Sequence, residues 1–505
     1  MNISIDRTSP IPVYLQIRNQ IREMILAGTL PAGYRLLPER KLAEILGVNR
    51  STVVSAYREL EADALIESHV GQGTSVRPLL ASAGAAAMGD VSAVSWNQLF
   101  RGEPARVREP LTRDLMELAM GEDVISLAAG MAAPELYPIE VLREIGDEVM
   151  REEGRIALQY GPTEGHHPLR ESISRLMSSR GAQVAPEEII LLSGSQQGLD
   201  LAARVFLDPG DVVVVEEPSF FCALQVFRAA GARIVGVPMD RDGMRLDILE
   251  SLLARYSPKL IYTLPTFQNP SGITMSLDRR RQLLEIAYRH QVPILEDDPY
   301  SELRYEGDPL PSLKAMDRHG YVLYLSTFSK MLLPGLRIGW LAAVRPVIRQ
   351  FALAKQLADL HSNNPAQRLI DRFLRRGLLD SQLARARAEY RRRRDVMLRS
   401  LEREAPPGLT WNRPEGGIYL WCRLPGNLSA SRLLNAAAQR KVAFVPGDAF
   451  FLGGMGQEYL RLNFSLPTPD RIRDGIARLM DALRDVMAET RDTNRGQELE
   501  ITPIV

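Results

Sequence analysis

Short apolar runs alternate with helical stretches from about residue 123 to residue 488, and this alternation constrains the fold most. Strands that alternate with helices favour an α/β domain built on a mostly parallel sheet. The runs are continuously apolar, as expected for strands whose two faces are both covered by helices. They include "EEIILLSG", "DVVVVEEP", "RIVGVPM", "KLIYTLP", "VPILEDD" and "YVLYLS".

Composition excludes several classes of protein. The 505 residues contain 62 Lys and Arg and 62 Asp and Glu, so net charge indicates no particular partner. Two cysteines are too few for a disulfide framework and fit a reducing compartment. No apolar run approaches the roughly 20 residues of a membrane span, and the first residues lack a signal-peptide pattern. We therefore expect a cytoplasmic protein with no membrane partner.

Shifts in composition predict four segments. Residues 1–77 form a compact helical pattern, and residues 78–113 are first rich in Ala, Ser and Gly and then polar, as in a linker. Residues 114–488 carry the α/β pattern. Residues 489–505 are polar, and we expect a flexible tail there.

The first segment has the spacing of a winged helix-turn-helix. "PVYLQIRNQIREMILAG" predicts an amphipathic helix, "ERKLAEILGV" a short second one, and "NRSTVVSAYRELEADALIE" a third, with Asn49 or Ser51 placed to cap it. A short helix, a turn around Gly47 and a third helix are helix-turn-helix spacing. Two short strands around a turn at Gly71 and Gly73 would form the wing.

Such a module would place the start of its third helix in the major groove of DNA. There the side chains at the helix start could reach base edges or phosphates, and cations of the preceding segments would flank the backbone. Nine Lys and Arg against eight Asp and Glu make residues 1–77 only weakly basic, so a protein-interaction module is an alternative at this point. The predicted DNA-binding residues are Arg35, Arg40, Lys41, Asn49, Arg50, Ser51, Thr52, Gly71 and Gly73.

Lys330, in "STFSKMLLPGLRIGW", directly follows a run that reads as a buried strand. An isolated lysine there is usually half of an ion pair, but other motifs along the chain favour a cofactor. In "LLSGSQQGLDLAARVF" the backbone N–H groups of Ser195 and Gln196 begin a helix and could cradle a phosphate. In "EEPSFF" Phe220 offers a flat surface for a heteroaromatic ring.

Asp297 and Asn269 each follow a predicted strand, in "ILEDDPYSEL" and "PTFQNPSG". A carboxylate at a strand end is costly to bury without a partner, and a protonated pyridine nitrogen would be such a partner. Together these motifs predict pyridoxal 5′-phosphate, with Lys330 as the catalytic amine of a Schiff base. Asp297 would bind the ring nitrogen and Phe220 the ring face. Asn269 and Tyr300 would bind the phenolic oxygen, and Ser195, Gln196, Thr327 and Arg337 the phosphate.

Two further groups are assigned no ligand. His166 and His167 show no metal-ligand spacing, so we expect no metal. The basic run "ARARAEYRRRRDVM" is expected to be a solvated helix face, with a contribution to DNA binding as the alternative.

Seven motifs in order make residues 120–485 resemble a fold-type I aminotransferase: "YGPTEGHHPLR", "SGSQQ", "EEPSF", "NPSG", "EDDPY", "SKMLLPGLRIGW" and "RLNFS". The resemblance implies a smaller C-terminal α+β subdomain after the mostly parallel sheet. It further implies that Arg461 grips the α-carboxylate of a substrate or effector and that Gly130 lies in a loop over it. It also implies that Tyr160 reaches the cofactor phosphate of a neighbouring subunit, hence a homodimer. The sequence of this loop is "AAGMAAPE", which differs from the usual Pro-Gly-Xaa-Pro-Asp motif of the family.

Residues 10–76 resemble a GntR-type winged helix, with "LLPER" in place of the usual Leu-Pro-Ser/Glu before the second helix. The proline is displaced to position 38, where we expect it in the first turn of that helix. The two parts together resemble the MocR/GabR-type transcription regulators. That resemblance implies a regulator that binds promoter DNA and senses an amino acid or amine by external aldimine formation at Lys330. Two alternatives stay open: an active aminotransferase with a DNA-binding appendage, and a regulator that senses pyridoxal phosphate itself.

Overall fold

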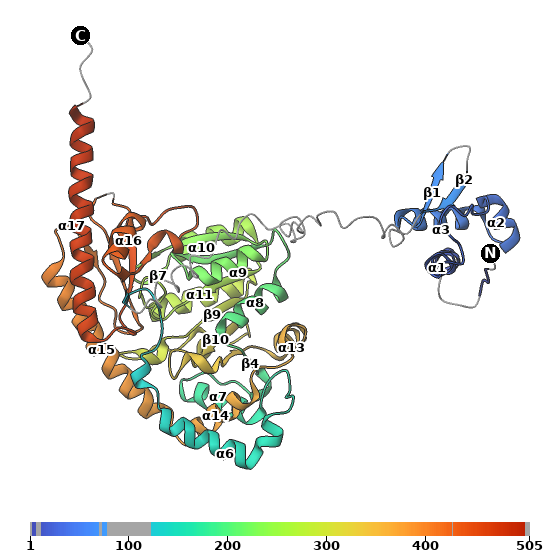
Figure 1. The fold of residues 1–505 in the computed structure, drawn as a ribbon. Coiled ribbons are helices and arrows are strands. Elements are labelled where there is room, and N and C mark those ends of the chain that lie inside the picture. Colours follow the sequence, from blue (N-terminus) through green and yellow to red (C-terminus); the bar gives the residue numbers. More distant parts are fainter. Residues whose placement is uncertain (1–2, 7–11, 70–72, 78–122, 427, 500–505) are drawn as a thin grey trace, which may run out of the picture. The chain divides into compact units, whose positions relative to one another are not determined.

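The computed structural model describes residues 3–6, 12–69, 73–77, 123–426 and 428–499. The chain divides into two compact units, residues 1–100 and 101–505 (Figure 1). The predicted linker at 78–113, residues 114–122 and Gly71 of the predicted wing lie outside the described residues.

In its described residues, the N-terminal unit has three helices and a two-stranded antiparallel ribbon. They are α1 (Val13–Leu26), α2 (Glu39–Leu46), α3 (Arg50–Ala62), β1 (Ile66–His69) and β2 (Gly73–Val76). Ile17, Ile21 and Ile25 recur on one face of α1 and are buried together with Val53 and Leu60 of α3. The predicted winged helix-turn-helix is therefore confirmed.

Two details at the helix starts differ from expectation. Asn49 occupies the N-cap position of α3, but its side chain makes no capping hydrogen bond. Pro38, expected in the first turn of α2, precedes that helix as its N-cap residue. The turn between α2 and α3 depends on Gly47, which has a φ of 62° and ends α2 in the left-handed conformation.

The second unit is built on an eight-stranded sheet with the order β4-β11-β10-β9-β8-β5-β6-β7. Six strands run parallel to one another, while β11 and β7 are antiparallel to their neighbours. The prediction of a mostly parallel sheet is confirmed. The strands are β4 (Ile189–Leu192), β5 (Val212–Glu217), β6 (Arg233–Asp240), β7 (Gly243–Met244), β8 (Leu260–Thr263), β9 (Ile294–Asp297), β10 (Val322–Thr327) and β11 (Gly339–Ala342).

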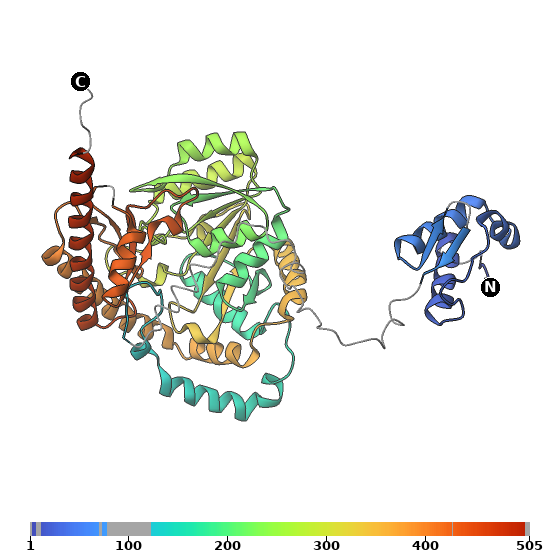
Figure 2. The same ribbon diagram turned by 45° about the horizontal axis from the view of Figure 1, so that its top comes forward.

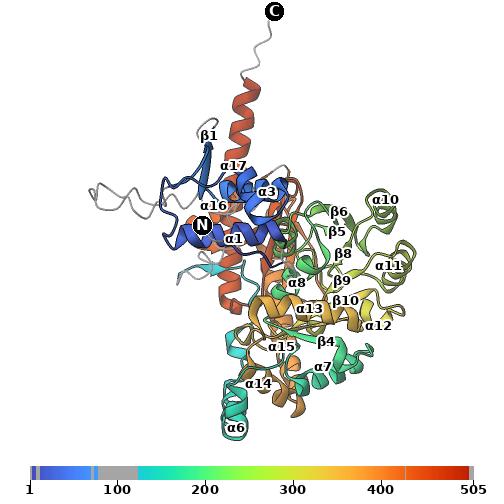
Figure 3. The ribbon, with the colours of Figure 1, turned by 90° about the vertical axis from the view of Figure 1, so that its right-hand side faces the viewer.

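Helices cover both faces of this sheet, which explains why the strand sequences are apolar throughout. Val214, Ile261 and Ile294 are buried against α10 and α11, whereas Val213 and Val215 belong to the larger core that includes α8. Figure 3 shows the central strands between α10 and α11 on one side and α8 and α13 on the other. These helices are α8 (Ser195–Phe206), α9 (Phe221–Ala229), α10 (Leu246–Tyr256), α11 (Leu277–His290), α12 (Leu313–Met316) and α13 (Arg345–Asp359).

A smaller α+β subdomain follows the large sheet, as predicted. Its four antiparallel strands have the order β12-β13-β16-β15, and α15, α16 and α17 pack around them (Figures 1 and 2). The elements are α15 (Leu378–Glu404), β12 (Thr410–Trp411), β13 (Tyr419–Arg423), α16 (Ala430–Gln439), β15 (Val445–Pro446), β16 (Tyr459–Asn463) and α17 (Pro469–Leu499). The other strands and α-helices of the described residues are β3 (Ile125–Ser126), which pairs with β14 (Val442–Ala443), and α6 (Ile139–Ala157), α7 (His167–Ser179) and α14 (Asn364–Arg375).

One expectation about this region stays a prediction and another needs correction. Helix α17 continues to Leu499, and residues 500–505 lie outside the described residues, so the flexible tail at 489–505 stays a prediction. Arg393 and Arg394 of the basic run are buried, not solvated. Arg393 donates to the carbonyl of Ser465 (2.6 Å), and Arg394 donates to the carbonyl of Pro414 (2.8 Å) and to Glu306.

None of the helices in the described ranges combines the length and the hydropathy that a membrane span requires.

Candidate cofactor site and nucleic-acid interface

A cavity of about 330 Å³ opens where β8, β9 and β10 end, at the carboxyl edge of the large sheet. Side chains after parallel strands meet at one edge, so residues far apart in sequence converge there. Of the predicted cofactor and effector residues, eleven line this cavity: Gly130, Ser195, Gln196, Phe220, Asn269, Asp297, Tyr300, Thr327, Lys330, Arg337 and Arg461. Tyr160 does not.

Lys330 lies three residues after β10 and donates to the carbonyl oxygen of Gly130. Burial lowers the pKa of its ammonium group, and the positive charges of Arg461 and Arg337 lower that pKa further. Since the neutral amine is the nucleophile toward a carbonyl, this environment favours imine formation. Tyr419, across the cavity, acts in the opposite direction.

Asp297 ends β9 and is fully buried. Its Oδ2 accepts a hydrogen bond from Tyr262 (2.9 Å), while its Oδ1 is buried with no partner. Burial raises the pKa of this carboxyl to about 7. An unpartnered carboxylate oxygen that faces a cavity fits the protonated ring nitrogen of pyridoxal phosphate, which would donate to it.

The phosphate end of the site is the start of α8. Gly194 precedes Ser195 with a φ of 91°, and a Cβ there would lie 2.3 Å from Nη2 of Arg337. Arg337 itself donates to the carbonyl of Ser193 (3.1 Å). Free N–H groups at a helix start beside a guanidinium are suited to an anion.

Sequence analysis missed Ser329 at this end of the cavity. Its hydroxyl accepts from Thr327 (2.9 Å) and from Arg337 (3.5 Å), so three side chains converge where a phosphate would lie. The signal was available, because Ser329 directly precedes the lysine.

Arg461 on β16 is 3% exposed and has only uncharged partners among the described residues. It donates to the side chain of Asn269 (2.8 Å) and to the carbonyl of Ala128 (2.9 Å), and its Nε is buried with no partner. A buried guanidinium without a carboxylate is costly unless a ligand supplies one. Its position therefore fits the predicted grip on an α-carboxylate.

Tyr419 on β13 was also missed, and it explains why residue 130 is a glycine. The guanidinium carbon of Arg461 lies 4.0 Å from the centre of the Tyr419 ring, and the Tyr419 hydroxyl lies 3.4 Å from that of Tyr300. A Cβ at Gly130 would lie 1.9 Å from the Tyr419 hydroxyl. The loop at Gly130 can thus lie over the cavity only without a side chain.

Tyr160 lies on the surface, 77% exposed, with its ring against that of His361. Gln196 and Arg337, at the phosphate end of the cavity, are exposed as well. The role of Tyr160 toward a neighbouring subunit remains a prediction. Among the described residues, no group of three His, Cys, Asp or Glu side chains could hold a metal ion.

The predicted DNA-binding residues lie on the surface of the N-terminal unit. Asn49, Arg50 and Ser51 are exposed at the start of α3, where Arg50 pairs with Glu39 (3.0 Å), and Thr52 is half-buried. Arg35, Arg40 and Lys41 are exposed, and none has an ion-pair partner within the described ranges. Gly73 is exposed at the start of β2. The backbone of Arg35 forms an isolated antiparallel β-bridge with that of Ser75 in β2.

Comparison with known families matches both units. The model for class I and II aminotransferases covers residues 122–479, and the model for bacterial regulatory proteins of the gntR family covers residues 13–76. The chain is 41% identical over 400 residues to aromatic-amino-acid aminotransferase 1 of Thermococcus litoralis, across 78% of this chain and 96% of that protein.

A second relative matches both units together. The "Probable rhizopine catabolism regulatory protein MocR" of Rhizobium meliloti is 31% identical over 479 residues, which is 95% of each chain.

Among solved structures, LysN of Thermus thermophilus, an α-aminoadipate aminotransferase complexed with N-(5′-phosphopyridoxyl)-L-leucine, superposes with a TM-score of 0.74. It is 39% identical and covers 78% of this chain and all of that chain.

Proposed function

Since the chain belongs to the MocR type of regulator, with a GntR-family helix-turn-helix and a class I and II aminotransferase domain, we propose that it binds promoter DNA and senses an amino acid or amine at Lys330. Its aminotransferase domain uses pyridoxal 5′-phosphate. When bound, that cofactor supplies an aldehyde that forms an imine with an amine and a ring that withdraws electrons. Because the DNA of a bacterium lies in its cytoplasm, we propose that the protein is cytoplasmic.

The observation that carries this proposal is the pairing of Lys330 with Arg461 in one cavity. Lys330 presents an amine whose pKa is lowered, and Arg461 presents a buried guanidinium without a carboxylate. An α-amino acid has the two complementary groups. Its amine would displace that of Lys330 while its carboxylate binds Arg461, giving a charge-assisted contact.

Other residues of the cavity would hold the cofactor in place for that exchange. Asp297 would accept the ring N–H at its unpartnered Oδ1. The N–H groups at the start of α8 and the Thr327 and Ser329 hydroxyls would donate to the phosphate, with Arg337 beside them. Asn269 and Tyr300 would donate to the phenolic oxygen.

A ligand changes DNA affinity only if it binds two conformations of the protein unequally. We propose that the loop at Gly130, between Lys330 and Tyr419, closes over the bound amino acid. The closed form would differ from the open form in how it presents the winged helices to DNA.

A homodimer is part of the proposal, because a single chain leaves several large apolar side chains exposed. Exposed apolar side chains lie on α6 and directly after it, and others lie on or directly after α13. They are Ile139, Met150, Ile156, Leu158 and Tyr160, and Leu353, Leu357 and Leu360.

A second candidate function is aminotransferase activity. It is favoured by the completeness of the cavity, which includes a lysine placed to carry a proton, and by the 41% identity to an aminotransferase. The two functions make different spectral predictions, so one experiment compares them.

The test uses the full-length holoprotein and DNA fragments selected by it from the genome of its source organism. We would titrate the twenty amino acids and simple amines, recording the cofactor absorption spectrum and the dissociation constant for the selected DNA. If the protein is a regulator, one compound changes both the absorption spectrum and the dissociation constant for DNA, and no keto acid is released. An aminotransferase cycles between two spectral forms and releases keto acid.

Lys330→Ala is the control, since it should lose the imine band of the free protein. If every compound that alters the spectrum leaves DNA affinity unchanged, sensing at Lys330 is rejected.

A further inference from the structure

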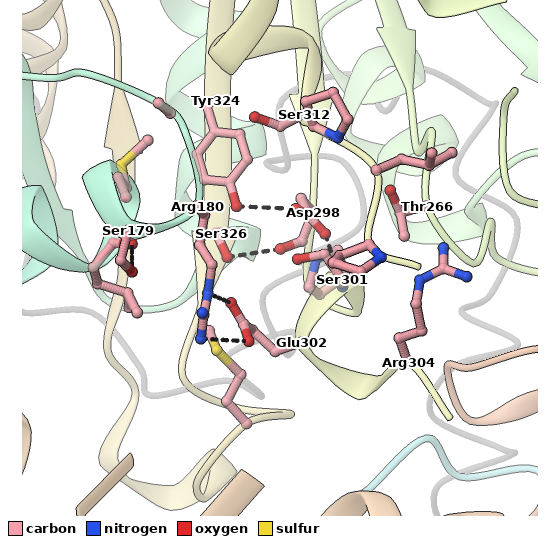
Figure 4. A pocket seen from close by; sticks show the side chains of 18 of the residues that line it. Ser179, Arg180, Thr266, Asp298, Ser301, Glu302, Arg304, Ser312, Tyr324 and Ser326 are labelled. Atoms are coloured by element: carbon pink, nitrogen blue, oxygen red, sulfur yellow. Dashed lines mark hydrogen bonds and ion pairs between the residues drawn. The ribbon is translucent and has the colours of Figure 1, made fainter. Parts of the chain in front are cut away.

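A second cavity, of about 550 Å³, lies in the aminotransferase unit beside the cofactor site (Figure 4). It is formed by the end of α7, residues 298–312, and side chains of β10 and β11. Pro299 is the one residue it shares with the cofactor cavity, within the described part of the chain. Its volume falls within the roughly 300–1,000 Å³ typical of small-molecule sites.

The acidic side chains of this cavity already have their partners. Oδ2 of Asp298 accepts from Tyr324 (3.0 Å), and Oδ1 accepts from the backbone N–H of Ser301 (3.0 Å). Glu302 accepts from Arg180 (2.7 and 3.1 Å) and from Arg387 (3.0 Å). Figure 4 shows the Arg180–Glu302 pair and the Tyr324–Asp298 contact around the cavity. The carboxylates of Asp298 and Glu302 therefore need no cationic ligand to pair with.

Two hydrogen-bond donors among the residues that line the cavity have no partner in the described part of the chain. Trp340 is 2% exposed, and its indole N–H is buried without an acceptor. Nη2 of Arg304 is likewise buried and unpartnered, although Nη1 of the same residue donates to Glu415 (3.0 Å). A buried donor without an acceptor is costly, because it has lost its hydrogen bonds to water. The missing groups at this cavity are thus hydrogen-bond acceptors.

The rest of the lining is largely apolar. Leu176, Met177, Leu310 and Met331 contribute hydrocarbon and thioether surface, together with prolines 299, 309 and 311. We propose that this cavity is a second small-molecule site, which takes a carboxylate with an apolar body. Its oxygens accept from Trp340 and Arg304, and its body lies against the apolar wall.

The cavity lies directly behind the cofactor residues. Asp298 follows Asp297 in sequence, Ser326 precedes Thr327, and Met331 follows Lys330. A ligand here contacts the same three backbone segments that hold the cofactor. The site is nevertheless distinct from the effector site proposed above, whose carboxylate partner is Arg461.

The experiment measures binding of 4-fluorophenylacetate to the full-length holoprotein by ¹⁹F NMR. We expect saturable binding to the wild type and about tenfold weaker binding to Trp340→Phe, which keeps the ring and removes the N–H. Leu310→Trp, which places a larger side chain in the apolar lining of the cavity, should weaken binding as well. The cofactor absorption band reports that each variant is folded.

Arg461→Lys separates this site from the proposed effector site. Binding that persists in Arg461→Lys and weakens in both cavity variants supports the proposal. Absence of saturable binding to the wild type overturns it. So does binding that is lost in Arg461→Lys and unchanged in both cavity variants, because the probe then occupies the effector site. The DNA response to amino acids is measured separately, so its failure would not be confused with either result.

Discussion

At the scale of single residues, the stability of the cofactor-free protein depends on whether the Asp297 carboxyl is ionised. Burial raises the pKa of its carboxyl from 3.8 to about 7. A raised pKa in the folded state contributes stability that is fully present below about pH 4 and is lost as pH rises through about 7. At pH 8 the folded apoprotein therefore bears the whole cost of an ionised, half-partnered carboxylate.

Asp297→Asn removes that titration, so we expect the cofactor-free variant to melt at a higher temperature than the cofactor-free wild type at pH 8. The difference should narrow at pH 5, where the wild type has lost less stability. Thermal unfolding of both proteins at the two pH values checks this. A melting-temperature difference that is the same at pH 5 and pH 8 would show that Asp297 does not titrate in this range.

Arg461 allows a prediction that separates the carboxylate from the amine of an effector. Lys at this position keeps the charge but cannot offer two parallel donors. For Arg461→Lys we expect amino acids to shift the cofactor spectrum at about 10- to 100-fold higher concentration, as when a charge-assisted contact of about 1.5–3 kcal/mol is lost. Methylamine, which has no carboxylate, should titrate as in the wild type. Equal weakening for methylamine would mean that Arg461 acts on the cofactor instead.

Residues placed at strand ends could be predicted from the sequence, while residues that reach the site from strand faces could not. Asp297 and Lys330 follow apolar runs whose carboxyl ends must share one sheet edge. Tyr262 lies within β8 and Tyr419 within β13, where the sequence predicts only core residues. Their contacts with Asp297 and Arg461 depend on how the strands are ordered, and local sequence does not encode that order.

At the scale of secondary-structure elements, the phosphate site depends on how closely β11 approaches the start of α8. A Cβ at Gly339 would lie 2.7 Å from the carbonyl oxygen of Ser326 and 3.1 Å from the backbone nitrogen of Ser195. We expect Gly339→Ala to push α8 away and to weaken pyridoxal phosphate binding at least tenfold, an effect of about 1.4 kcal/mol. Fluorescence titration of the apoprotein with the cofactor measures it.

Gly335→Ala is the matched control, since a Cβ there would meet nothing within 4 Å. Equal cofactor affinity in the two variants would contradict a role for the β11–α8 approach.

Substitutions at the start of α3 and on α2 are expected to affect DNA binding in different ways. Arg50, exposed at the start of α3, would contact a base edge, and Lys41 on α2 would contact the backbone. We expect Arg50→Ala to cost about 1–3 kcal/mol on the preferred sequence and little on random DNA. Lys41→Ala should weaken binding to the preferred sequence and to random DNA to the same degree. It should also reduce the slope of log affinity against log salt concentration by about one.

Fluorescence anisotropy at several salt concentrations measures these effects. Arg58→Ala changes an exposed arginine farther along α3 and serves as control. If all three variants weaken binding alike, the proposed docking of the start of α3 is wrong.

The type of each element could be predicted more readily than its partners. Continuous apolar runs indicated buried parallel strands, and this is confirmed. The reversal of β11 had a signal that the prediction missed, because no α-helix lies between β10 and β11, and neighbouring strands joined without a crossover helix pair antiparallel. The burial of Arg393 and Arg394 could not be predicted, since several of the carbonyls and carboxylates that bind them lie on other elements.

At the scale of the whole molecule, the exposed apolar side chains of α6 and α13 predict how chains associate. Leu357 is 90% exposed on α13, and Tyr160, after α6, is 77% exposed. Large exposed apolar surfaces usually mark an interface, and we expect these side chains to belong to one. We expect a solution mass of about twice the 56.4 kDa of one chain, which light scattering after size-exclusion chromatography measures.

Leu357→Glu should shift this mass toward that of the monomer, because a carboxylate would be buried without a partner. The same variant should bind pyridoxal phosphate more weakly, since Gln196 and Arg337 are exposed in one chain and Tyr160 would complete their site from its neighbour. Met455→Glu, at another exposed apolar residue of the same unit, should leave both mass and cofactor affinity unchanged. A dimer that survives in Leu357→Glu would place the interface elsewhere. A monomer that keeps full cofactor affinity would confine the whole phosphate site to a single chain.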